Sequence, residues 1–212
     1  MPFDDPEIDA IIDKHIENRA ALGRFPPPTR ETIQVIDAVM ELVAPLDLID
    51  GKAPIEDEYG HIAMTVFHLR TLKVQNVFIV AFSGGAPSRP NFDKIRAVLK
   101  PAPLLAALGM IGAPDDYVAF WFEYRMNPEV AAWPCAEPKA LVVAEKLGST
   151  VVDQQTGAQL LGFACRWRAS SQLATPHRLN IPFVETREAF MLPCEQCLSL
   201  FGKAELWPHI HV

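Results

Sequence analysis

The sequence predicts an α+β or mixed α/β protein, in which a helical N-terminal segment packs on a small mixed sheet. Residues 77–82 form an uninterrupted apolar run, which is typical of a strand buried on both faces. Residues 117–124 form a second run of strand length that is rich in aromatic residues. Segments of helical composition alternate with these runs, as expected for a mixed sheet. We therefore expect 77–82 and 117–124 to be the central strands.

The first 50 residues contain two predicted helices. Apolar residues recur at helical spacing from Ile8 to Ile16, and Asp5 followed by Pro6 favours a helix start. This helix is expected to end near Gly23, before a stiff connector of three prolines. Thr29 is the expected cap of a second helix. We divide the chain into a helical segment, residues 1–50, and an α/β core, residues 51–212, which has a less regular extension from about 155. The two parts are expected to form one compact unit.

Residues 55–72 fit either a strand or a helix. The apolar residues of this segment also lie at helical spacing, and acidic residues at 56–58 with basic Arg70 and Lys73 suit the two ends of a helix dipole. We therefore predict a helix here. Further helices are predicted at 93–99, 103–110, 136–147, 157–168 and 192–200, and short strands at 150–152, 180–184 and 210–212.

Composition and charge limit the class of protein. Half of the 212 residues are hydrophobic, and the net charge is −7. This charge repels phosphate backbones, so it argues against broad nucleic-acid binding and favours a protein partner with a basic surface. No apolar stretch approaches the ~20 residues of a membrane span, and the acidic N-terminus does not resemble a signal peptide. We expect a cytoplasmic protein that does not bind membranes and whose four cysteines are thiols.

A metal site is one candidate for chemistry. Cys194 and Cys197 form a C-x-x-C, and His209 and His211 form an H-x-H close behind. Together they offer four nitrogen and sulfur ligands, which is a set suited to tetrahedral zinc. The alternative is that the cysteines pack as small apolar residues and the histidines belong to a loosely ordered chain end. The sequence indicates no cofactor other than this zinc ion.

A glycine turn after the first strand is the second candidate site. Main-chain N–H groups in such a turn attract anions, and an arginine nearby can close on a phosphate or carboxylate. The residues concerned are Ser83, Gly84, Gly85, Ser88 and Arg89. The alternative is a tight turn that needs small residues. Trp133 and Trp207 stand beside prolines, and we expect them to face a partner.

These observations favour an acidic cytoplasmic binding or accessory protein that recognises another macromolecule, for instance an immunity- or inhibitor-like protein that neutralises a basic partner. The alternative is a small enzyme or ligand-binding protein that uses the anion site at Ser83–Gly85 or the zinc site near the C-terminus. The sequence leaves open whether the protein is an enzyme.

Overall fold

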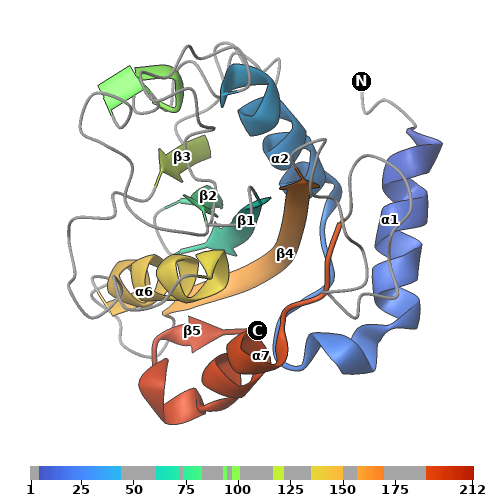
Figure 1. Ribbon diagram of the computed structural model, residues 1–212. Coiled ribbons are helices and arrows are strands. Elements are labelled where there is room, and N and C mark those ends of the chain that lie inside the picture. The colour runs from blue at the N-terminus through green and yellow to red at the C-terminus, as the bar shows by residue number, and fades with distance from the viewer. Residues whose placement is uncertain are drawn as a thin grey trace.

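One mixed sheet organises the part of the chain that the structure describes. Figure 1 shows the computed structural model, which describes residues 5–43, 61–71, 74–82, 93–94, 97–100, 117–121, 135–149, 157–169 and 190–212. The strands are β1 (His61–Arg70), β2 (Asn76–Phe82), β3 (Tyr117–Trp121), β4 (Ala158–Ala169) and β5 (Ile210–His211). The main helices are α1 (Pro6–Glu17), α2 (Arg30–Val43), α6 (Ala136–Ser149) and α7 (Glu195–Gly202). The predicted fold class is confirmed.

The described strands lie in the order β3-β2-β1-β4-β5. β1 is the central strand and pairs antiparallel with β2 and β4, whereas β2 pairs parallel with β3 and β4 pairs parallel with β5. The sheet is therefore mixed. The prediction that 117–124 is a central strand was wrong for the described sheet, because β3 pairs only with β2 and lies at the edge.

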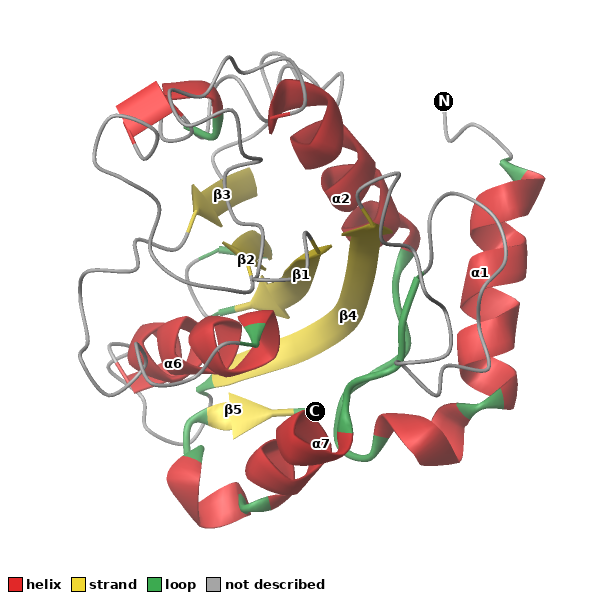
Figure 2. Ribbon diagram, in the orientation of Figure 1, coloured by secondary structure: helices red, strands yellow, loops and turns green. Residues whose placement is uncertain are grey.

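Helices cover both faces of the sheet, which lies between α2 and α6 in Figure 1. Phe67 and Leu69 of β1 pack in the same apolar cluster as residues of α6 and α7. Met64 and Val66, with the opposite parity, pack in a second cluster with residues of α1 and α2. Because side chains alternate across a strand, the molecule has three layers. Figure 2 shows the helices around the sheet in the same view.

The N-terminal helices begin where the sequence predicts. Asp5 accepts hydrogen bonds at Oδ1 from the main-chain N–H groups of Glu7 and Ile8, at 3.1 and 3.4 Å. Thr29 and Thr32 cap α2 reciprocally, because each hydroxyl accepts a hydrogen bond from the other residue's N–H. A 3₁₀ helix (Arg19–Leu22) continues from α1 to Gly23, whose φ is 58°. These contacts satisfy N–H groups that helix starts leave without partners.

Two predicted helices are strands in the structure. Residues 61–70 form β1, and residues 158–169 form β4. Both strands are inside the sheet and are covered on both faces, so apolar residues occur on both faces of each strand and imitate helical spacing. Gly162 of β4 also lies so close to Thr29 that a Cβ would be 2.6 Å from its Cγ2 atom. β1 and β4 pair with each other although they are distant in sequence, and the local pattern of neither strand contains this pairing.

The remaining predicted elements fall into three groups. The helices predicted at 136–147 and 192–200 and the strand at 210–212 are confirmed as α6, α7 and β5. Helix α6 continues to Ser149, and Gly148 admits the carbonyl oxygen of His209, which would be only 2.4 Å from a Cβ at this position. The predicted elements at 103–110, 150–152 and 180–184 lie outside the described residues. Within the helix predicted at 93–99, residues 93–94 and 97–98 are helical. No helix in the described ranges is long and apolar enough to cross a membrane.

His68 makes the fold sensitive to acid. Its buried ring bonds Asn76 Oδ1 through Nε2 (2.9 Å) and the Thr29 hydroxyl through Nδ1 (3.4 Å). Burial lowers the pKa of His68 below its usual 6.5, although the bond to Asn76 and the charge of Glu31 oppose this. The unfolded chain therefore binds a proton more readily, and this part of the stability is present above about pH 6.5 and is lost as the pH falls further.

We expect His68→Gln to reduce the loss of unfolding free energy on acidification by about 1 kcal/mol. Urea unfolding at a series of pH values between about 8 and 5 measures this slope. His211→Gln is the control, because His211 is exposed and its replacement should leave the slope unchanged. An equal slope for wild type and His68→Gln would contradict the assignment.

Candidate metal centre

Two helix N-termini meet on one face of the sheet. Cys135 immediately precedes α6, and Cys194 is the residue before the first turn of α7, which contains Cys197. Pro193 precedes Cys194, whose φ of −68° and ψ of 163° are extended, and α7 begins directly after it. Since α6 and α7 contact each other, the three cysteines come together although Cys135 is distant in sequence from the C-x-x-C.

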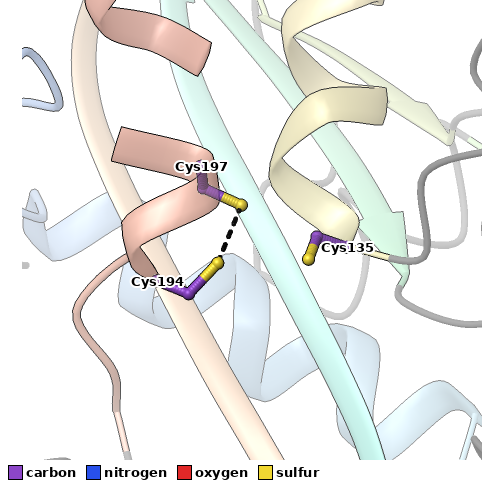
Figure 3. Close-up of side chains that lie close together, drawn as sticks. All are labelled: Cys135, Cys194 and Cys197. Carbon is purple, nitrogen blue, oxygen red and sulfur yellow. Dashed lines mark hydrogen bonds between the residues drawn. The ribbon is translucent and has the colours of Figure 1, made fainter. Parts of the chain in front are cut away.

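The three sulfur atoms have the spacing of a metal site. They all lie within 4.8 Å of one another, and the Sγ atoms of Cys194 and Cys197 are 3.4 Å apart. Figure 3 shows Cys135 at the start of α6, beside the pair of cysteines at the start of α7. Zinc–sulfur bonds of about 2.3 Å in a tetrahedron place neighbouring sulfurs about 3.8 Å apart. The three thiols therefore fit a single thiophilic ion with little movement.

The surroundings of the sulfurs favour a negative charge. Hydrogen bonding with the side chains of Cys135 and Cys197 lowers the pKa of Cys194 far below its usual value. Hydrogen bonding with Cys194 raises the pKa of Cys135, and hydrogen bonding with Cys135 and then with Cys194 raises the pKa of Cys197. The N-terminal dipoles of two helices also stabilise an anion here. Cys194 is exposed whereas Cys197 is buried, so the site opens to solvent on the side of Cys194.

A buried carboxyl group lies beside the sulfurs. Glu137, in the first turn of α6, is only 6% exposed. Burial raises its pKa, and hydrogen bonds from the thiols of Cys197 and Cys165 oppose this effect. Glu137 is thus in contact with one of the three clustered cysteines without belonging to the metal-ligand group. A raised pKa is the direction expected for a carboxyl group that acts as a general acid and base.

A lysine is also buried here. Lys139 of α6 has no exposed surface, and its Nζ donates a hydrogen bond of 2.7 Å to the carbonyl oxygen of Phe82, at the end of β2. Burial lowers the pKa of Lys139 to about 7, and the charges of Cys135 and Glu137 oppose the shift. Cys135 and the first residues of α6 therefore bring together a candidate metal ligand, a carboxyl group and an amino group.

The structure separates the four ligands that the sequence grouped. Cys194 and Cys197 lie in the three-sulfur group, but His209 and His211 do not. The His209 main-chain N–H donates to Glu145 Oε2 at 3.1 Å, and its ring Nδ1 forms a hydrogen bond with the same carboxylate. Glu145 follows Cys135 by ten residues of α6, or about 15 Å at 1.5 Å per residue. His209 therefore lies toward the other end of α6, and the candidate metal ligands among the described residues are the three cysteines.

The other predicted site residues have different outcomes. Trp207 is 8% exposed and its Nε1 donates to the carbonyl oxygen of Leu200 at 3.0 Å, so its side chain belongs to the core and is not available to a partner. Its neighbour Pro208 suggested a loop, but the apolar ring packs against α7 and the sheet. Trp133 and the turn residues Ser83, Gly84, Gly85, Ser88 and Arg89 lie outside the described residues.

Comparison with known proteins identifies no relative of this chain. No protein-family model, curated protein or solved structure matches the chain. The chemistry of the site must therefore be inferred from its own residues.

Sequence reasoning missed Cys135 and Glu137, although a signal is present. Cys135, Ala136 and Glu137 form a C-x-E at a helix start, and Pro193 introduces the later C-x-x-C. One known pattern of zinc sites consists of a first ligand, a glutamate two residues later and a distant P-C-x-x-C. The C-x-E alone is too short to stand out, and it gains meaning only when paired with the C-x-x-C.

Proposed function

We propose that this protein is a zinc-dependent hydrolase that removes an exocyclic amino group from a nitrogen heterocycle of the cytosine or adenine type. The observation that carries the proposal is the buried Glu137 beside the three convergent sulfurs of Cys135, Cys194 and Cys197. Zinc-dependent nucleobase deaminases combine three histidine or cysteine ligands with a glutamate that is not a ligand and acts as general acid and base.

The donor set favours a catalytic site over a closed structural one. Structural zinc sites are held by four protein ligands, whereas catalytic sites have three and keep one position for water or substrate. The metal-ligand group among the described residues has three members. When bound, a zinc ion in such a site lowers the pKa of water at the open position. The exposed side of Cys194 gives water and a small substrate a route to this position.

The residues divide the reaction between them. Water adds to the ring carbon that carries the amino group, the carbon–nitrogen bond breaks, and the products are a ring carbonyl and ammonia. Glu137 takes a proton from the water and delivers it to the nitrogen atoms, so one carboxyl group serves both halves of the reaction. Its position in the first turn of α6 keeps its carboxyl next to the ligands, and its burial limits exchange with bulk water.

The net charge of −7 narrows the substrate class. A free base or nucleoside is favoured over a long polynucleotide, because the protein field repels a phosphate backbone. The same charge is the observation that favours the other hypothesis, a binding protein for a basic partner. That hypothesis does not account for a buried carboxyl group next to three clustered thiols, which is why we place the enzyme first.

The test uses the purified full chain, loaded with zinc, and a panel of amino-substituted bases and nucleosides. Ammonia release and replacement of the amino group by oxygen, followed by mass spectrometry, measure turnover. We expect about one equivalent of zinc and turnover of at least one panel member, lost after chelation and restored by zinc. A chain that binds no zinc would overturn the metal site. A chain that binds zinc and deaminates nothing in the panel would overturn the activity.

A further inference from the structure

A buried lysine accompanies the three-cysteine site. Lys139 is fully buried, and its Nζ bonds the main-chain oxygen of Phe82 at 2.7 Å. Lysine is seldom fully buried, because taking an ammonium group out of water is costly unless negative charges compensate. A carbonyl oxygen supplies a hydrogen bond but no charge. The position is therefore best explained by anionic groups nearby.

Two such groups lie at the start of α6. Cys135 immediately precedes the helix and stands four residues before Lys139, and its charge acts on the Lys139 amino group. Glu137 lies between them in sequence and is buried as well. The charges of Cys135 and Glu137 both favour the ammonium form of Lys139. The interaction is reciprocal, so the ammonium favours the anionic forms of both.

Metal loading increases the need for compensation. Three thiolates outweigh the two positive charges of a zinc ion, and an ionised Glu137 adds another negative charge in a buried place. A positive group beside the ligands lowers the free energy of this arrangement, because Coulomb interactions are stronger away from bulk water. Among the described residues next to the sulfurs, Lys139 is placed to supply that charge.

We propose that Lys139 is a positioning residue of the zinc site, whose ammonium compensates the negative charge of the three thiolates and Glu137 and so strengthens metal binding. Its bond to Phe82 holds the ammonium in place by tying the first turn of α6 to the end of β2. This inference rests on the proposed zinc site and is independent of the deaminase activity.

The test compares zinc affinities, measured by competition with a chromophoric chelator, for the wild-type chain and three variants. Lys139→Met removes both the charge and the hydrogen-bond donor. Lys139→Gln removes the charge and keeps an amide donor for Phe82. Lys146→Met is the matched control, because Lys146 is exposed on the same helix and its loss changes the net charge equally. Circular dichroism with and without zinc reports folding.

We expect both Lys139 variants to bind zinc about tenfold more weakly or worse, as for other residues that support metal ligands from outside the ligand shell. Lys146→Met should bind zinc as the wild type does. Wild-type affinity in Lys139→Gln would show that the charge is not needed and would overturn the proposal. Failure of both Lys139 variants to fold even in excess zinc would make the role structural and would also overturn it. A wild-type chain without zinc affinity would instead overturn the site itself.

Discussion

Glu137→Gln is expected to lower kcat for deamination by about 10²- to 10⁴-fold, while the zinc content stays at about one equivalent. Glutamine has nearly the shape of the carboxyl group, so the buried position beside Cys197 is kept. It cannot take a proton from water or deliver one to the departing amino group. Steady-state kinetics on the best substrate of the panel, with metal analysis of the same sample, measures both quantities.

The matched control for this experiment is Glu145→Gln. Glu145 lies on the same helix, but its carboxylate pairs with His209 at the far end, away from the sulfurs. This substitution removes the same charge, and we expect kcat to remain within about twofold of the wild type because no catalytic contact is lost. Equal activities of Glu137→Gln and the wild type would exclude Glu137 as the general acid and base. Loss of zinc from Glu137→Gln would point to a role in metal binding.

A short sequence pattern predicts a helix or strand when the residues that determine it lie within or next to that element. Helix α2 is preceded directly by its threonine cap, and both the helix and the cap are confirmed. Strand β2 is an apolar run too short for a buried helix. Strands β1 and β4 were misassigned because their identity depends on each other: Thr65 pairs with Cys165, one hundred residues later along the chain. No short window contains that pairing.

The candidate site follows the same rule. Cys194 and Cys197 belong to one helical turn, so their spacing alone predicts that both sulfurs can bind one ion. Cys135 reaches them only because α6 and α7 pack on the same face of the sheet. His209 was predicted as a ligand because it follows the C-x-x-C closely in the sequence. The chain turns through a short 3₁₀ helix (Ala204–Leu206) after the C-x-x-C, and His209 then lies beside Glu145. Nearness along the chain was a poor guide to nearness in space.

Cys135→Ser is the substitution expected to affect metal binding most. A serine hydroxyl does not ionise near neutral pH and is a poor ligand for zinc, so two cysteine ligands would remain. We expect the zinc content to fall from about one equivalent to near zero after dialysis against a weak chelator. The stabilisation that zinc gives the wild type, about 3 kcal/mol at a few hundred times Kd, should disappear in urea unfolding.

The double variant His209→Ala, His211→Ala decides between the two ligand sets. If the three sulfurs hold the ion, this variant keeps its zinc, and its stability falls only through loss of the pair between His209 and Glu145. If the C-x-x-C and the histidines hold the ion, the variant loses zinc and Cys135→Ser keeps it. The two variants thus give opposite results under the two assignments. The position of His209 beside Glu145, about 15 Å along α6 from Cys135, makes the three-cysteine result the expected one.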